Sequence, residues 1–225
     1  MSSSTFKKEL FAQFAQVGKS LSNGNRLALL EFLAQGECTV DGLAKASGLS
    51  VANTSQHLQG LRRSGLVKSR AEGQKSFYRL SDYSVVALLA LMRKIAEENI
   101  AEIQILVKDY LSSKDDLEPI SRDELLKRAQ KGTITVLDVR PEQEFESGHL
   151  PHAINIQLSE LKDELKRLPQ KKEVVAYCRG PFCIMAFEAV EQLRSKGYKA
   201  RRLEDGFPEW KLENLPIEDG LSSTK

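Results

Sequence analysis

The chain has 225 residues, of which 41% are hydrophobic and 28% are charged, and its formal net charge is +2. This is the composition of an ordinary soluble protein with one or two domains. No stretch is long and apolar enough to span a bilayer, and three cysteines, an odd number, do not make a disulfide framework. We therefore expect a cytoplasmic protein without membrane partners.

The first quarter of the chain predicts a series of helices. Apolar residues at helical spacing predict helices over residues 6–17, 25–33, 41–46 and 51–63. Gly48 separates the last two, and Ser50 is the expected N-cap of the second. Two short helices that are separated by a glycine turn predict a helix-turn-helix.

The second helix of this pair carries short polar side chains along its N-terminal half. Side chains of this kind reach base edges and phosphates when a helix enters the major groove. The alternative is a polar face that is only solvated. The candidate DNA contacts from this helix are Ser50, Asn53, Thr54, Ser55, Gln56 and His57.

A basic hairpin is predicted after this helix. Apolar and polar residues alternate over 65–70 and 75–80, on both sides of a turn at Gly73. This pattern is typical of a β-hairpin. A hairpin directly after a recognition helix is a wing, and its basic side chains would contact phosphates. The candidate phosphate contacts are Arg62, Arg63, Lys68, Arg70, Lys75 and Arg79, which face one acidic residue in residues 60–79.

This half of the chain resembles the ArsR-type winged-helix repressors. The resemblance rests on residues 50–80, with His57-Leu58 and Leu61, then Gly65-Leu66-Val67, then Tyr78-Arg79-Leu80. Metal-sensing members carry paired cysteines before the turn, whereas Cys38 is the only cysteine before residue 178, so we expect no metal site. We interpret Cys38 as a core residue.

Apolar residues near a three-four spacing predict one long helix from Tyr83 to Tyr110. This stripe is longer than one small domain needs, and it fits the dimerisation helix of the ArsR family. The resemblance therefore implies a homodimer through this helix, bound to double-stranded DNA at a palindromic operator. We place the first domain at 1–111, a linker at 112–118 and a second domain at 119–225.

The second domain alternates strands and helices. Strands are predicted over 133–139, 173–177 and 200–203, and helices over 122–131 and 158–168. This alternation predicts a parallel sheet with helices on both faces. The expected fold class is a mainly α winged helix-turn-helix with a β-hairpin wing, followed by an α/β domain with a parallel sheet.

A cysteine follows the strand at 173–177, at the start of a tight loop and a helix. Backbone N–H groups and the helix dipole can stabilise the Cys178 thiolate there, and Arg179 adds positive charge. The alternative is a small buried core cysteine.

Residues 117–220 resemble the rhodanese family. The matching pieces are Leu137-Asp138-Val139-Arg140 with Glu144-Phe145 after it, Gly148-His149-Leu150-Pro151, the Cys178 loop, and Asp205-Gly206-Phe207-Pro208-Glu209-Trp210. The resemblance implies that Cys178 attacks a sulfane sulfur, holds it as a persulfide and passes it to a thiol acceptor. We expect an ion pair between Asp138 and Arg140 and a structural hydrogen bond from His149. The candidate catalytic residues are Cys178, Arg179, Gly180, Pro181, Phe182 and Cys183.

Cys183 has two interpretations. It is either a second core cysteine or a thiol that resolves a Cys178 persulfide or sulfenate. The expected function is a DNA-binding repressor whose rhodanese domain senses or transfers sulfane sulfur. The alternatives are a sulfurtransferase that the first domain dimerises or brings to DNA, and an inert binding module. No cofactor is expected, and the expected partners are DNA, a second copy, a sulfane-sulfur donor and a thiol acceptor.

Overall fold

A computed structural model describes residues 2–111 and 119–220 and divides the chain into two compact units, Met1–Val86 and Ala87–Lys225. The linker that we place at 112–118 lies outside the described residues, and the domain boundary there stays a prediction. Among the described residues no helix combines the length and the apolar character needed to cross a membrane.

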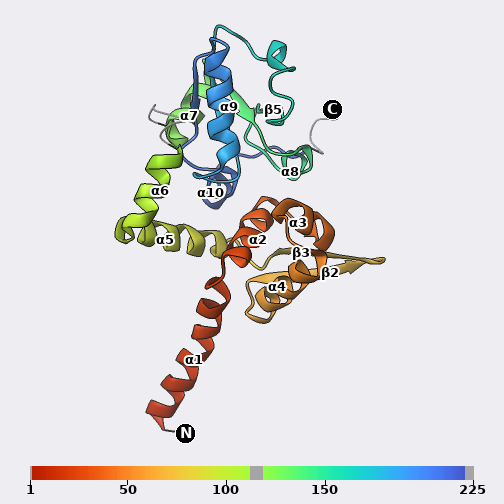
Figure 1. Cartoon of the computed structure of the whole chain (residues 1–225), viewed down its shortest axis with the longest axis vertical. Helices are drawn as coiled ribbons and strands as arrows, with labels where there is room; N and C mark the ends of the chain where they lie inside the picture. Colours follow the sequence, from red (N-terminus) through yellow and green to blue (C-terminus); the bar gives the residue numbers. More distant parts are fainter. Residues whose placement is uncertain (1, 112–118, 221–225) are drawn as a thin grey trace. The chain divides into compact units, whose positions relative to one another are not determined.

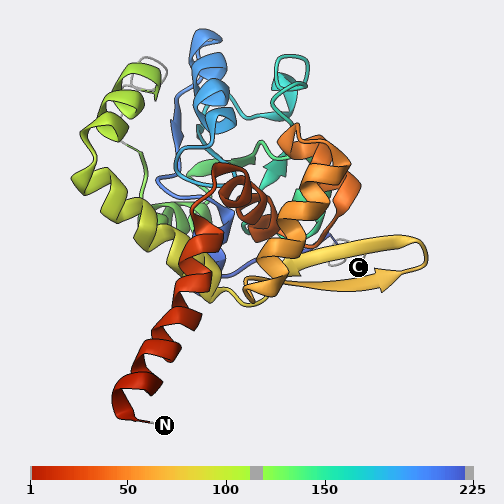
Figure 2. The ribbon, with the colours of Figure 1, turned by 60° about the horizontal axis from the view of Figure 1, so that its bottom comes forward.

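The first unit holds a helix-turn-helix followed by an antiparallel hairpin (Figure 1). Its elements are α1 (Ser3–Leu21), α2 (Gly24–Gln35), β1 (Cys38–Thr39), α3 (Val40–Ser47), α4 (Val51–Arg63), β2 (Val67–Glu72) and β3 (Lys75–Leu80). The three strands form one antiparallel sheet in the order β1-β3-β2. In Figure 2 the β2–β3 hairpin extends as a long two-stranded ribbon, as expected of a wing.

Local sequence signals fix the ends of these helices. The side chains of Asn23, Thr39 and Ser50 cap α2, α3 and α4 by accepting hydrogen bonds from backbone N–H groups of the first turns. Gly48 ends α3 in the left-handed conformation, with φ of 71°, which favours glycine. The predicted helix-turn-helix and hairpin are confirmed.

The helix predicted over residues 83–110 is wrong as a continuous element. The chain forms α5 (Ser84–Asn99) and α6 (Ala101–Leu111), with a break at Ile100. At the break, the side chains of Asn99 and Gln104 donate hydrogen bonds to the carbonyls of Ile95 and Glu97. The apolar periodicity continues across the break, and for this reason it did not reveal the bend that Figure 1 shows between α5 and α6.

The second unit contains a four-stranded parallel sheet in the order β5-β4-β6-β7. After α6, the elements of this unit are α7 (Arg122–Gln130), β4 (Ile134–Asp138), α8 (Glu142–Glu146), β5 (Ile154–Asn155), the 3₁₀ turn η1 (Leu165–Arg167), β6 (Glu173–Tyr177), α9 (Ile184–Ser195), β7 (Ala200–Arg202) and α10 (Phe207–Leu212). The predicted parallel sheet is confirmed. The α-helix predicted over 158–168 is wrong, because this segment forms turns and η1 around the buried Leu161 and Leu168.

Alternate residues of the central strands pack into two cores, one on each face of the sheet. Val174 and Ala176 of β6 pack with α9 on one face, whereas Val175 and Tyr177 pack with α7 and α10 on the other. Successive strand side chains point to opposite faces, so one buried strand serves both cores. This arrangement places the residue after β6, Cys178, at the carboxyl end of the sheet, where reactive groups of such folds lie.

Candidate functional site

The exposed face of α4 is the first candidate site. Leu58 and Leu61 are fully buried and hold the helix on its unit. Ser50 accepts a hydrogen bond from the backbone N–H of Asn53 at 3.3 Å, so the helix starts where the sequence predicts. Thr54 is also fully buried, and its hydroxyl donates to the carbonyl of Ser50 at 3.0 Å. We therefore remove Thr54 from the proposed DNA contacts. The other predicted residues of this helix, which are exposed or half-buried, are Ser50, Asn53, Ser55, Gln56 and His57.

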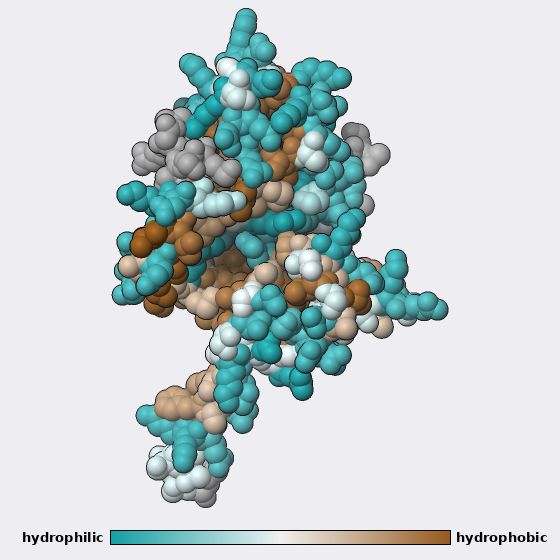
Figure 3. All heavy atoms as spheres, viewed as in Figure 1, coloured by the Kyte–Doolittle hydropathy of each residue, from teal (hydrophilic) through white to brown (hydrophobic). Residues whose placement is uncertain are grey.

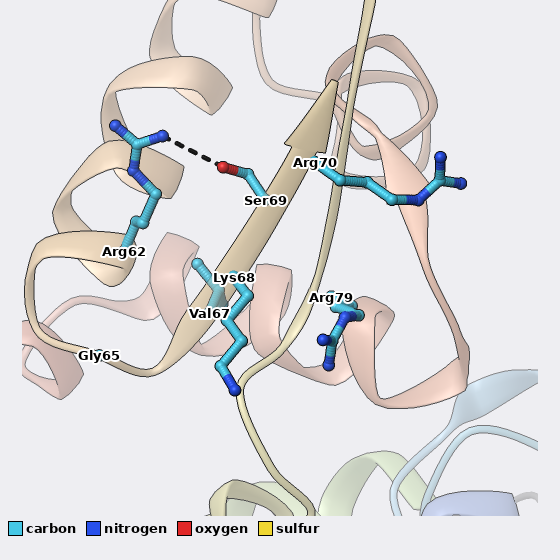
Figure 4. Close-up of a pocket in the computed structure, with 7 residues that line it drawn as sticks. All are labelled: Arg62, Gly65, Val67, Lys68, Ser69, Arg70 and Arg79. Atoms are coloured by element: carbon cyan, nitrogen blue, oxygen red, sulfur yellow. Dashed lines mark hydrogen bonds between the residues drawn. The ribbon is translucent and has the colours of Figure 1, made fainter. Parts of the chain in front are cut away.

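The base of the wing forms an open basic hollow of about 600 Å³ (Figure 4). Arg62 donates a hydrogen bond from Nη1 to Oγ of Ser69 at 3.1 Å, which joins the end of α4 to β2. Lys68 and Arg79 line the same hollow. These basic side chains therefore come together on one surface, as a phosphate-contacting wing requires. Arg63 and Lys75, the remaining predicted phosphate contacts, are both exposed.

Arg70 differs from the other basic residues of the wing because acidic residues already pair with it. Its guanidinium lies 2.6 Å from a carboxylate oxygen of Glu37 and also contacts Glu72. The hydrogen bonds to Glu37 and Glu72 raise the pKa of Arg70, whose side chain is half exposed. In Figure 4 it points away from Arg62. Arg70 is thus less available to phosphate than Lys68 or Arg79.

The cysteine loop after β6 is the second candidate site. Cys178 is 1% exposed, and a disulfide joins it to Cys183, with the two Cα atoms 6.1 Å apart. Cys183 is half-buried, occupies the N-cap position of α9, and its N–H donates to the carbonyl of Gly180 at 3.1 Å. The loop therefore brings together the two thiols that the sequence places five residues apart. Pro181 is half-buried and Phe182 is exposed between them.

Arg179 is held by Glu144, a residue of the rhodanese resemblance to which no role was assigned from the sequence. Its guanidinium makes a two-pronged contact with the Glu144 carboxylate, with the shortest N–O distance 2.6 Å. Both side chains are largely buried. The positive field that we expected Arg179 to apply to Cys178 is consequently offset by Glu144. A separation of 35 residues explains why no local pattern revealed this pair.

Gly206 supports the loop from behind. A Cβ at this position would lie 2.3 Å from the backbone nitrogen of Gly180 and 2.4 Å from the carbonyl carbon of Arg179. The N–H of the next residue, Phe207, donates to the carbonyl of Cys178 at 3.0 Å. Only a residue without a Cβ allows this close approach of two backbone segments. The start of α10 therefore fixes the position of the cysteine loop.

A buried charged cluster lies below the loop. The expected ion pair is present: Nη2 of Arg140 lies 2.6 Å from Oδ2 of Asp138, and both side chains are fully buried. The Tyr177 hydroxyl donates to the same Asp138 oxygen and accepts from the N–H of Leu150 at 3.1 Å. Burial lowers the pKa of Arg140, but the attraction and hydrogen bonds of Asp138, together with Tyr177 and Glu144, raise it overall. Burial, with Asp138, raises the pKa of Tyr177 well above its usual value. The cluster is therefore a structural support for the carboxyl ends of β4 and β6.

His149 is held by contacts with α8 and with the C-terminal segment. Its Nδ1 lies 2.9 Å from the carbonyl of Phe145, its ring stacks on Phe145 with centroids 3.7 Å apart, and it is 4% exposed. Its Nε2 lies 3.7 Å from the Glu218 carboxylate. These contacts tie α8 to the C-terminal segment of the unit.

Two contacts join the cysteine-loop region to α5 and α6 within the second unit. Nη2 of Arg93 on α5 lies 2.9 Å from Oε1 of Glu209, whose other oxygen accepts from the N–H of Gly206 at 3.2 Å. Phe182 of the loop lines a cavity of about 320 Å³ together with Ile103 and Val107 of α6. A conformational change in the loop can therefore be transmitted to α5 through the Arg93–Glu209 ion pair and to α6 through Phe182.

The described residues contain no group of three or more histidine, cysteine, aspartate or glutamate side chains arranged to hold a metal ion. Cys38 is half-buried on β1, and its sulfur would lie 2.7 Å from a Cβ added at Gly42. Cys38 therefore packs closely against α3 without being fully buried, and its interpretation as a core residue stays a prediction.

Two protein families match parts of the chain. "Bacterial regulatory protein, arsR family" matches residues 23–69, and "Rhodanese-like domain" matches residues 121–213. The first contains α4 with the start of the wing, and the second contains the cysteine loop.

Similar proteins match either nearly the whole chain or one part of it. The HTH-type transcriptional regulator Rv0324 of Mycobacterium tuberculosis is 44% identical over 214 residues, covering 95% of this chain and 94% of that protein. The putative sulfurtransferase YtwF of Bacillus subtilis is 27% identical over 81 residues, covering 36% of this chain and 77% of that protein. The solution structure of the homodimeric winged helix-turn-helix DNA-binding domain Mb0332 of Mycobacterium bovis, a possible ArsR-family regulator, is 42% identical and covers 42% of this chain and 87% of that one, with a TM-score of 0.40.

Proposed function

Because the chain belongs to the ArsR family of bacterial transcriptional regulators and carries a C-terminal rhodanese-like domain, we propose that it is a repressor whose DNA binding responds to sulfane sulfur at Cys178. The observation that carries this proposal is the pairing of Cys178 with Cys183 at the end of β6. A sulfur-transfer loop needs one nucleophilic thiol. A switch needs a second thiol, which converts the persulfide into a lasting disulfide.

The proposed reaction has two steps. The Cys178 thiolate attacks the outer sulfur of a persulfide donor, forms a Cys178 persulfide and releases the donor as a thiol. The Cys183 thiolate then attacks the inner sulfur of this persulfide and expels hydrosulfide. The product is the disulfide between Cys178 and Cys183. The two cysteines lose two electrons in total, and the sulfane sulfur gains them as it leaves as sulfide.

We propose that DNA contacts come from the exposed face of α4 and from the wing hollow, in a homodimer. Exposed apolar side chains on α1, α5 and α6 support the dimer, because a monomer in water leaves such rows without partners. On α1 they include Phe6, Phe11 and Phe14, each more than half exposed. Figure 3 shows apolar atoms on the surface of α1 and again over α5 and α6.

The contact between Arg93 and Glu209 is the proposed route from the loop to the DNA-binding domain. Disulfide formation changes the backbone conformation around Gly180, which lies against Gly206. Glu209 holds Gly206 with one carboxylate oxygen and Arg93 of α5 with the other. Oxidation at the loop therefore biases the position of α5, which follows directly from the wing.

A DNA-binding titration tests the proposal. Fluorescence anisotropy on the DNA upstream of the gene is measured with the reduced protein, before and after treatment with glutathione persulfide. We expect the dissociation constant of the wild type to rise at least 10-fold, equal to about 1.4 kcal/mol, and that of Cys178→Ser to stay constant. Cys38→Ser is the matched control, because it removes the third cysteine and should respond like the wild type. An equal response of wild type and Cys178→Ser contradicts the proposal.

Arg93→Ala separates sulfur chemistry from its transmission. We expect this variant to consume glutathione persulfide and form the disulfide like the wild type, but its DNA affinity should then change less than 3-fold. Lys94→Ala is the control, since Lys94 is an exposed neighbour on α5 whose contact with Glu98 is 3.9 Å. A full response of Arg93→Ala to persulfide shows that this ion pair is not the route.

A sulfurtransferase is the second candidate function, and the likeness to the putative sulfurtransferase YtwF favours it. In this case the protein turns over thiosulfate with a thiol acceptor, and sulfur donors leave DNA binding unchanged. The third candidate, an inert binding module, predicts that iodoacetamide alkylates reduced Cys178 no faster than an ordinary thiol near neutral pH.

A further inference from the structure

A second basic cavity of the first unit lies at the C-terminal end of α4 and shares Arg63 with the proposed DNA contacts. It has a volume of about 380 Å³ and is lined by residues of α1, α2 and the C-terminal end of α4. Its charged lining residues are Lys19, Arg26 and Arg63, and no acidic residue of the described chain lines it. Of these three residues, only Arg63 was predicted from the sequence to contact phosphate.

Arg26 is the most enclosed of these side chains. A Cβ added at Gly60 of α4 would lie 3.4 Å from both Cζ and Nη2 of its guanidinium, so this group packs against the helix at a residue without a side chain. Its Nε is buried and finds no hydrogen-bond partner in the part of the chain that the structure describes. A buried donor without an acceptor is unfavourable, and the penalty is larger for a charged group.

The charges around the cavity are not neutralised from within the protein. Within residues 2–111 and 119–220, Lys19, Arg26 and Arg63 make no ion pair, in contrast to Arg70 on the wing and Arg93 on α5. Three like charges around one cavity repel each other, and an anion between them would remove this repulsion. The hydroxyl of Ser64, which also lines the cavity, is directed to carbonyls of its own helix.

We propose that this cavity binds a tetrahedral oxyanion of the phosphate or sulfate type. The guanidinium of Arg26 offers N–H groups in a fixed plane, which suits two oxygens of such an anion, and Lys19 and Arg63 supply further charge. The anion is either a backbone phosphate of bound DNA or a free oxyanion. The position at the C-terminal end of α4 fits a phosphate that flanks the groove, because the proposed base contacts lie on the N-terminal half of the same helix.

The first arm of the test measures the salt dependence of DNA binding by the full-length protein. If the anion is a DNA phosphate, Arg26→Ala should reduce the slope of log K against log salt concentration by about 0.9 for each copy bound. Lys131→Ala is the matched control, since it removes one exposed positive charge in the second unit. Its slope should equal that of the wild type.

The second arm measures thermal unfolding of the free protein by far-UV circular dichroism. Inorganic phosphate and sulfate are compared with chloride at equal ionic strength. If the cavity takes a free oxyanion, these ions should raise the unfolding midpoint of the wild type and of Lys131→Ala but not that of Arg26→Ala. A slope change without this shift identifies DNA as the source of the anion, and the reverse result identifies a free ion.

Lys19→Ala repeats both arms with an exposed lining residue that is not among the proposed DNA contacts, and it serves as the decisive variant if Arg26→Ala does not fold. An unchanged salt slope together with an equal response to phosphate, sulfate and chloride overturns the proposal. A weaker homodimer as the sole effect of the variants also overturns it, because the cavity would then receive a side chain of a second copy.

Discussion

Substitution of Gly206 by alanine should displace the cysteine loop. The new Cβ would lie 2.3 Å from the nitrogen of Gly180, about 1.1 Å closer than the 3.4 Å of an ordinary contact. The obstructing atoms are backbone, so no side-chain rotation relieves the clash. The φ angle of Gly206 is −114°, which alanine adopts freely, so the whole effect comes from the collision. We expect the free energy of unfolding to fall by about 3 kcal/mol, the upper part of the range for overpacked sites.

The single tryptophan of the chain provides the assay. Trp210 is fully buried in the second unit, so its fluorescence in urea follows the unfolding of this unit alone. The control is Gly197→Ala, where φ is 82° but no atom lies within 4 Å of the new Cβ. The control should lose about 1–2 kcal/mol from its backbone conformation. The disulfide of Gly206→Ala should also form at least 10-fold more slowly. If Gly206→Ala is no less stable than Gly197→Ala, the reasoning from backbone contact is refuted.

Two further predictions concern the buried cluster below the loop, and both use the same fluorescence assay. Asp138→Ala leaves the charge of Arg140 buried without its carboxylate and should reduce the free energy of unfolding by about 3–5 kcal/mol, whereas a loss below 1 kcal/mol would contradict the assigned pairing. Unfolded tyrosine ionises near pH 10, and the pKa of Tyr177 in the folded protein is higher. The stabilisation by Tyr177 is therefore fully present below about pH 10 and is lost as the pH rises above it. Tyr177→Phe should therefore be less stable at pH 8 by about 1–3 kcal/mol but show a smaller fall between pH 9 and pH 11, and equal alkaline falls in both proteins would contradict this cause.

Elements with strong local signals were predictable from the sequence. Strand β6 has the predicted bounds because its residues form a short apolar run before a Gly-Pro pair. The N-cap of α4 was predictable because Ser50 stands directly before a helical pattern. In both cases a few neighbouring residues determine the structure.

The failures come from structure that neighbouring residues do not determine. The periodicity of residues 83–110 is continuous, so it could not reveal a break at Ile100. Strand β1 has only two residues, too few for any alternation to be seen. The helix predicted over 158–168 has suitable spacing, but tertiary packing of its leucines selects turns instead.

Two ion pairs around the cysteine loop could not be predicted from the sequence for a different reason. Glu144 and Arg179 are 35 residues apart, and Arg93 and Glu209 are 116 residues apart. Charged residues are common enough on a protein surface that their pairing across such distances leaves no pattern. The Cys178 loop and the buried Asp138–Arg140 pair could be picked out from the sequence, whereas the long-range ion pairs of Arg93 and Arg179 could not.

The disulfide between Cys178 and Cys183 closes a small ring within a single chain. Ring closure inside one molecule is a first-order process, so its rate does not depend on how many copies of the protein a cell contains. A disulfide between two chains would instead form faster as the protein became more abundant. A regulator built on this loop would report the chemical state of its surroundings and be insensitive to its own copy number, even if it repressed its own gene.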